Sequence, residues 1–168
     1  MINLTAPINS LGYGVAGYNI FKSLYNINSS VALYPISKPE FVDEYIATGI
    51  DNQSRNTLLL SQSSLEFPSV KIWHQNDIHS HVGKGLHVGF PIFELTEFDQ
   101  EEKRSIEHCD RIFACSQWAK DIVIDQTKFT SQDVHVVPLG VDTELFKPSQ
   151  SSRSPTTFFN CGKWEKRK

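Results

Sequence analysis

Residues 110–148 constrain the fold of this chain more than any other segment. Their sequence, DRIFACSQWAKDIVIDQTKFTSQDVHVVPLGVDTELFKP, predicts a buried strand at 111–115, a helix at 117–126 capped by Ser116, and a second strand at 134–138. A turn follows, in which Gly140 permits a sharp exit from the strand and Asp142 is placed to cap residues 143–146. A strand, a helix and another strand in this order are typical of a parallel α/β sheet.

The rest of the chain continues this alternation, so we expect an α/β fold with a Rossmann-like parallel sheet flanked by helices. Short apolar runs suit strands that are buried on both faces. The predicted strands are 2–6, 31–36, 70–74, 87–93, 111–115 and 134–138. The predicted helices are 15–25, 39–48, one that opens within 96–99 and continues to Glu107, 117–126, and a polar segment with a single apolar patch at 52–64.

Length and composition limit the possible classes of protein. The 168 residues have room for about one domain, since domains usually hold ~100–200 residues. A hydrophobic content of 39% and a charged content of 21% are ordinary for a globular chain. No apolar run approaches the ~18 residues that a transmembrane helix needs, and the N-terminus lacks the pattern of a signal peptide.

Charge and cysteine content narrow the classes further. The formal charge is −3, and the basic residues at 163–168 leave the rest of the chain more acidic still. An acidic body argues against nucleic-acid binding, which needs a clustered basic face. The odd set Cys109, Cys115 and Cys161 has no CxxC spacing, so a disulfide framework is disfavoured and a reducing cytoplasm is expected, with peripheral attachment to a membrane left open.

Three glycines lie between the first predicted strand and the first predicted helix. Gly12, Gly14 and Gly17 satisfy G-x-G-x-x-G literally, and such a loop can bring backbone amides close to an anion. No acidic residue follows the second strand, where Ser37 and Lys38 stand instead, so NAD binding is disfavoured. The alternative is that the glycines serve only a tight strand-to-helix turn.

A group of histidines follows the third predicted strand: His74, His79, His81 and His87. Carboxyl ends of parallel strands are where open α/β sheets bind ligands, so His74, Gln75 and Asp77 are candidates for contact with an acceptor substrate. The alternatives are solvated loop histidines and, with less support, a metal site, because His79 and His81 lack well-spaced further ligands.

Glu94 directly follows the aromatic Phe93 at the end of the fourth predicted strand. A carboxylate here can accept a hydrogen bond from a sugar hydroxyl or stabilise positive charge that develops on a sugar ring. The alternative is that Glu94 caps the next helix or pairs with Lys103 or Arg104.

The chain closes with a polar, serine-rich stretch, an apolar run at 157–161, and Gly162 followed by Lys163 and Lys168. Without further context, a charge run at a chain end is usually solvated.

Residues 110–148 and this terminal motif together resemble the junction between the two domains of retaining glycosyltransferases of family 4, which have the GT-B fold. The resemblance implies that residues 1–148 form the N-terminal acceptor-side domain, that 149–156 form a linker, and that 157–168 begin a missing donor-binding domain. It implies transfer of a sugar from a nucleotide-diphosphate sugar to a hydroxyl of a glycan, lipid or other acceptor, with retention and without a metal or other cofactor.

The resemblance also suggests roles for individual residues. Gly12 and Gly14 would face the donor phosphates, and Lys163 and Lys168 would hold the diphosphate. Family members often carry a histidine after the aromatic residue, so Glu94 departs from the pattern at the position nearest the transferred sugar. Two other classes stay open: a non-catalytic module that binds phosphate or glycan, and a His-rich metal-binding domain.

Overall fold

The computed structural model describes residues 1–27, 30–40, 49, 52, 65–143, 146–148 and 158. The helices predicted at 39–48 and 52–64, the linker at 149–156 and the segment 157–168 lie wholly or almost wholly outside these residues.

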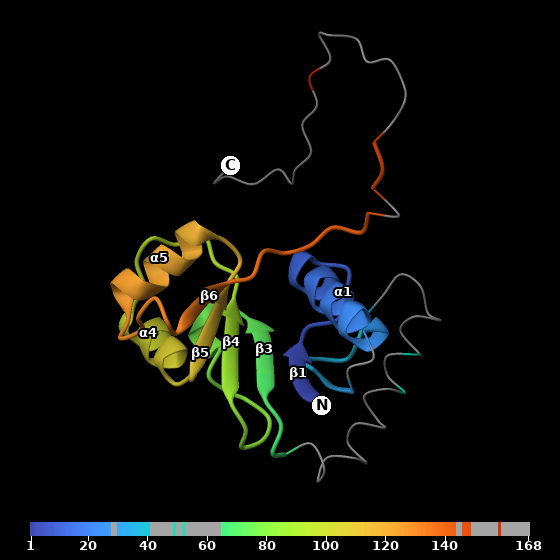
Figure 1. Ribbon diagram of the computed structural model, residues 1–168, viewed down its shortest axis with the longest axis horizontal. Coiled ribbons are helices and arrows are strands. Elements are labelled where there is room, and N and C mark those ends of the chain that lie inside the picture. Colours follow the sequence, from blue (N-terminus) through green and yellow to red (C-terminus); the bar gives the residue numbers. More distant parts are fainter. Residues whose placement is uncertain are drawn as a thin grey trace.

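The described residues form one six-stranded sheet in which all strands are parallel, in the order β2-β1-β3-β4-β5-β6 (Figure 1). The strands are β1 (Ile2–Ala6), β2 (Val31–Pro35), β3 (Ser69–Trp73), β4 (His87–Pro91), β5 (Arg111–Ala114) and β6 (Val134–Val136). All six predicted strands are present, and the expected Rossmann-like α/β fold is confirmed. Five of them end one or two residues earlier than predicted, which is the usual uncertainty at the end of an element.

Helices cover both faces of the sheet (Figure 1). They are α1 (Gly12–Asn26), the 3-10 turn η1 (Gln75–Asp77), α4 (Gln100–Glu107) and α5 (Gln117–Gln126). Helix α1 packs on β1, β2 and β3, whereas α5 packs on β5 and β6 on the other face and α4 packs on η1.

Two helix starts show which side chains set the local structure. Ser116 caps α5 as predicted, since its Oγ accepts a hydrogen bond from the amide of Ala119 at 3.1 Å. Helix α4 begins later than Thr96 because Asp99 is its cap. The Asp99 carboxylate accepts from the amides of Glu101 and Glu102, and the Glu102 carboxylate accepts in return from the amide of Asp99 at 2.9 Å.

Alternating strand residues build a separate core on each face of the sheet. Leu4, Ile72 and Phe90 are buried on the α1 face, and Ile112 and Val134 are buried on the face of α4 and α5. Full burial of one such side chain stabilises the fold by roughly 1.5–3 kcal/mol.

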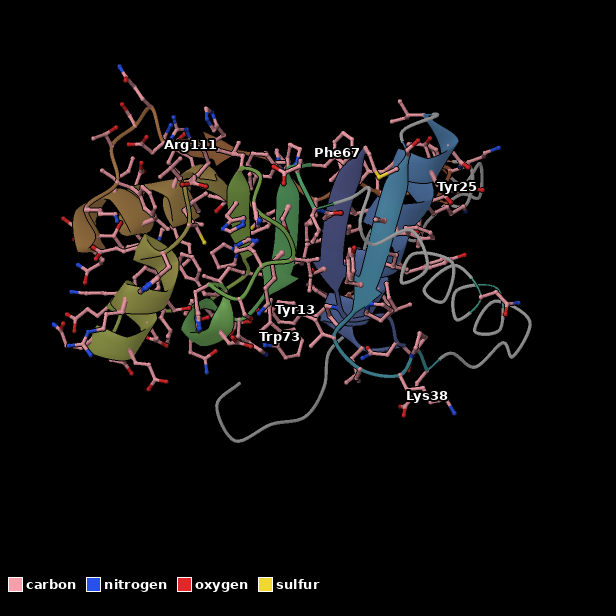
Figure 2. The ribbon with its side chains drawn as sticks, turned by 90° about the horizontal axis from the view of Figure 1, so that it is seen from below. Tyr13, Tyr25, Lys38, Phe67, Trp73 and Arg111 are labelled. Atoms are coloured by element: carbon pink, nitrogen blue, oxygen red, sulfur yellow. The ribbon has the colours of Figure 1, made fainter. Side chains whose placement is uncertain are left out.

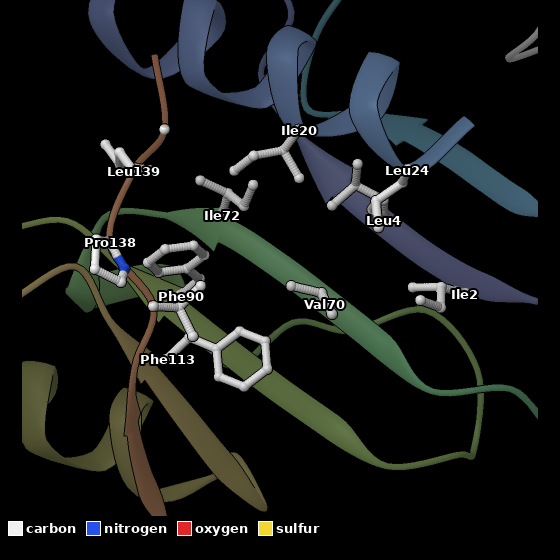
Figure 3. A pocket seen from close by; sticks show the side chains of 12 residues that line it. Ile2, Leu4, Ile20, Leu24, Val70, Ile72, Phe90, Phe113, Pro138 and Leu139 are labelled. Carbon is white, nitrogen blue, oxygen red and sulfur yellow. The ribbon is translucent and has the colours of Figure 1, made fainter. Parts of the chain in front are cut away.

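The α1 face also contains a cavity of about 240 Å³ (Figure 3). It lies between α1, the sheet and the chain leaving β6, and it is lined by Ile2, Leu4, Ile20, Leu24, Val70, Ile72, Phe90, Phe113, Val137, Pro138, Leu139 and Gly140. Every lining residue is apolar, so this cavity offers no side chain that could recognise a phosphate or a hydroxyl. Among the described residues, no helix is both long and apolar enough to cross a membrane.

Candidate functional site at the carboxyl edge of the sheet

Parallel strands bring three separate parts of the chain to one edge of the sheet. Strand β1 ends at Ala6 and leads to the start of α1, β3 ends at Trp73 before His74, and β4 ends at Pro91 before Glu94. Figure 2 shows Tyr13 and Trp73 close together at this edge, with Phe67 and Arg111 at the opposite, amino edge.

The three glycines lie within α1 rather than in a loop before it, because the helix begins at Gly12. A Cβ on Gly14 would approach atoms of Asn9 to less than 3.0 Å, and a Cβ on Gly17 would approach the carbonyl oxygen of Pro7 and Cβ of Ala6 equally closely. These two glycines therefore allow α1 to pack against the segment that follows β1. Packing alone is enough to require glycine at these two positions.

Gly12 is different, since it is exposed and a Cβ there would have nothing within 4 Å. Its amide is the first of the helix, and the first i to i−4 bond is donated by Val15 to the carbonyl of Leu11. The cap residue Leu11 supplies no side-chain hydrogen bond, and the first turn contains no acidic residue. Backbone amides and the helix dipole at this end thus favour an anion.

Tyr13 connects the start of α1 to the ends of β3 and β4. Its hydroxyl donates a hydrogen bond to the carbonyl oxygen of Ile92 and lies 3.3 Å from Nδ1 of His74. Its ring centroid is 4.6 Å from that of His74 and 5.8 Å from that of Trp73. Burial, together with the nearby acidic groups of Cys115 and Glu94, raises the pKa of Tyr13 to about 12, so the phenol stays protonated at physiological pH.

Glu94 is exposed and lies two residues beyond Ile92, which Tyr13 holds. Its negative charge is the smallest of the three causes that raise the pKa of Tyr13. The helix that follows is capped by Asp99, so Glu94 is not the cap of α4. Glu94 and the start of α1 therefore meet at the same edge, as the parallel topology predicts.

The remaining acceptor candidates, Gln75 and Asp77, turn away from this group. Gln75 Nε2 donates to Glu102 of α4 at 2.8 Å. The Asp77 carboxylate pairs with Nζ of the buried Lys71 at 3.2 Å and accepts from Ser80 Oγ at 3.1 Å. Lys71 also donates to the Asp77 carbonyl and to Ser80 Oγ. These contacts tie the connection between β3 and β4 to the sheet and to α4.

The histidines that looked like one group in the sequence lie in different places. His74 is at the carboxyl edge, whereas the stacked rings of His81 and His87 lie at the amino edge, 4.6 Å apart with an interplanar angle of 4°. His81 Nδ1 lies 3.2 Å from Ser69 Oγ, in the first residue of β3, and His87 is the first residue of β4. The connection between β3 and β4 runs back along the strands from the carboxyl edge to the amino edge. His74 therefore cannot share one site with His81 and His87.

His81 is not a solvated loop histidine, because it is partly buried beside Cys109, with Nε2 3.5 Å from the sulfur. Burial, and to a lesser extent His87 and Lys71, lowers the pKa of His81 to about 4. Burial and Asp110 raise the pKa of the Cys109 thiol to about 12. In the part of the chain that the structure describes, no group of three or more His, Cys, Asp or Glu side chains is arranged to hold a metal ion.

The remaining predicted residues are Lys163, Lys168 and Asp142. Lys163 and Lys168 lie outside the described residues. Asp142 accepts a hydrogen bond from the amide of Phe146 through its backbone carbonyl at 2.9 Å, and its carboxylate lies 4.0 Å from Lys22 Nζ. The capping role predicted for its side chain stays a prediction.

Sequence reasoning missed Tyr13, Trp73 and Lys71. Tyr13 stands inside the glycine pattern and Trp73 inside the strand predicted at 70–74, but neither pattern indicates what these two side chains contact. A lysine at the centre of a buried strand is itself a signal, since such a charge needs a partner.

Comparisons with known proteins bear on two of the three segments at this edge, those that follow β3 and β4. Neither a curated protein nor a solved structure matched the chain. Residues 73–145 match the family model described as Glycosyltransferase Family 4, and they include His74, the Glu94 segment, α4, β5, α5 and β6. Residues 73–145 are thus similar to family 4 glycosyltransferases, and the sheet to which they belong has a Rossmann-like α/β fold.

Proposed function

We propose that this domain is the acceptor-side half of a retaining glycosyltransferase with the GT-B fold, which transfers a sugar from a nucleotide-diphosphate sugar to a hydroxyl acceptor. One observation supports the proposal: His74 and Glu94 belong to the segment that matches Glycosyltransferase Family 4, and both lie near Tyr13 at the start of α1. Ligands of open parallel sheets bind at this edge, outside the carboxyl ends of the strands.

In this proposal Glu94 faces the reacting sugar. Its exposed carboxylate stabilises the positive charge that develops on the sugar ring in the transition state, or accepts a hydrogen bond from a sugar hydroxyl. Gly12, at the open start of α1, faces the donor phosphates. Gly14 contributes its amide to the same turn, although its lack of a side chain serves packing against Asn9.

The acceptor is assigned to His74, with Gln75 and Asp77 shaping the adjoining turn. Both of these side chains already have protein partners, so His74 is the group best placed to contact a hydroxyl. The free thiols of Cys109 and Cys115 suit a reducing compartment, and we propose a cytoplasmic enzyme.

The second wall of the cleft belongs to a donor-binding domain. We propose that residues 1–148 form the acceptor domain, that 149–156 link it to the donor domain, and that 157–168 begin that domain. Lys163 and Lys168 would then neutralise the leaving diphosphate, and no metal is required for the transfer. Because this proposal assigns the donor pocket to that second domain, the 168-residue chain assayed alone should transfer no sugar. Turnover of any nucleotide sugar by that chain would overturn the assignment of donor binding to a second domain.

The catalytic assignment is tested in a two-domain glycosyltransferase that carries the same residues. Glu94→Gln should lower kcat strongly and leave donor affinity nearly unchanged, because the carboxylate acts on charge that exists only in the transition state. Glu97→Gln, in the same exposed segment, is the matched control. An unchanged kcat in Glu94→Gln would make Glu94 a structural residue, and donor or acceptor binding without turnover would favour a non-catalytic binding module.

A further inference from the structure

The Tyr13 hydroxyl has a single proton, and that proton is already used. It is donated to the carbonyl oxygen of Ile92, which can only accept. Toward Nδ1 of His74, at 3.3 Å, the phenol oxygen can therefore only accept. Because the pKa of Tyr13 is raised to about 12, ionisation of the phenol does not change these roles near neutral pH.

The direction of this hydrogen bond determines where the imidazole carries its proton. Nδ1 of His74 must be the N–H donor, so in the neutral ring Nε2 keeps its lone pair. His74 is exposed, and Nε2 has no hydrogen-bond partner among the described residues. The ring is also held in orientation by Tyr13 and Trp73, with centroids 4.6 and 4.9 Å away.

We infer that Tyr13 is a positioning residue that fixes His74 in the Nδ1–H tautomer, so that Nε2 accepts a hydrogen bond from the hydroxyl of the acceptor substrate. The inference rests on the proposed function for the identity of the ligand, but the tautomer itself does not. The same Tyr13 hydroxyl donates its hydrogen bond to Ile92, two residues before Glu94. One side chain therefore sets the position of His74, which binds the acceptor, relative to Glu94, which faces the sugar.

The tautomer is measured by long-range proton–nitrogen NMR on the 168-residue chain labelled with ¹⁵N-histidine. The pH is kept above ~6.5, the pKa of an unperturbed histidine side chain. His74→Gln identifies the signals of His74. We expect a protonated Nδ1 and an unprotonated Nε2 in the wild type, and a shift toward the Nε2–H tautomer in Tyr13→Phe. Tyr25→Phe makes the same chemical change at the exposed far end of α1 and should leave the His74 signals unchanged.

The wild-type spectrum decides the tautomer even if Tyr13→Phe does not fold, which the signals of the partly buried His81 would reveal. An Nε2–H tautomer in the wild type would overturn the inference. So would an unchanged tautomer in a folded Tyr13→Phe chain.

The ligand role is tested with glycerol as a small polyol and 1,2-dimethoxyethane as an ether without hydroxyl groups. Glycerol should shift the Nε2 signal of His74 more than that of the exposed His135, and the ether should not. Equal shifts of the His74 and His135 signals would contradict the hydroxyl-binding role of His74 but not its Nδ1–H tautomer. If the tautomer holds but a two-domain enzyme with these residues transfers no sugar, it is the proposed function that fails.

Discussion

Asn9 and Gly14 pack so tightly that a Cβ on Gly14 would come within 3.0 Å of the amide nitrogen, carbonyl oxygen and Oδ1 of Asn9. Asn9 in turn accepts a hydrogen bond from the amide of Leu11 through Oδ1 at 2.9 Å. This contact fixes the angle at which the chain leaves β1 and enters α1. The position of Tyr13 depends on that angle.

Gly14→Ala should therefore destabilise the fold by ~1–3 kcal/mol, the usual cost of forcing extra atoms into a packed site. Gly12→Ala is the matched control, because a Cβ there has open space and alanine favours a helix over glycine by up to ~1 kcal/mol. Denaturant unfolding of both variants measures the difference. Equal free energies of unfolding for the two variants would show that the segment around Asn9 can move aside without loss of stability.

Asp99→Ala should lower the free energy of unfolding by ~0.5–2 kcal/mol, because two amides at the start of α4 lose their acceptor. Asp99→Asn keeps an acceptor oxygen and should lose much less. Thermal or denaturant unfolding distinguishes the two. A loss as large for asparagine as for alanine would show that charge, rather than the hydrogen bonds, supports this helix.

The free energy of unfolding should fall as the pH is lowered from ~6.5 toward 4. His81 has a pKa of about 4 in the folded chain, against ~6.5 for an unfolded histidine. The unfolded state therefore binds more protons in this window, and stability is lost on acidification. Denaturant unfolding at several pH values should show a shallower slope for His81→Asn than for the wild type.

His135→Gln, at an exposed histidine of β6, serves as the control and should keep the slope of the wild type. A slope that persists unchanged in His81→Asn would assign the acid sensitivity to other groups.

Cys109 should resist alkylation in the folded chain, since it is 5% exposed and its thiol pKa is raised to about 12. Cys115 is only half-buried and should be modified first of the two. Iodoacetamide labelling followed by peptide mass mapping, with and without guanidinium, measures both rates. Labelling of Cys109 at the same rate in native and unfolded protein would contradict its burial.

The strands and helix caps were predictable because their signals are local. The apolar run at Ile2–Ala6 and the serine before Gln117–Gln126 each act within a few residues, and the structure has both where the sequence places them. The glycine pattern is local as well, but it does not show that Gly14 lies inside a helix and packs against Asn9. Phosphate binding by Gly12 and Gly14 stays a prediction.

The candidate site was predictable only at the level of topology. Parallel strands place the ends of β1, β3 and β4 at one edge, so the meeting of the start of α1 with Glu94 follows from the fold class. The hydrogen bond from Tyr13 to Ile92 joins residues far apart in the chain and depends on side-chain packing. The division of the histidines depends on the crossover between β3 and β4, whose path along the sheet has no signature in the spacing of His74, His79, His81 and His87.

The order of strands also has a consequence for synthesis of the chain. Of the six described strands, β1 is synthesised first, yet it lies inside the sheet, between β2 and β3. Its partner β2 follows soon after, but the other side of β1 pairs with Ser69–Val70–Lys71, which the ribosome adds much later. Until then β1 presents an open hydrogen-bonding edge, the kind of edge that recruits other chains. The vulnerable moment for this protein therefore falls during translation, before β3 emerges to close the gap.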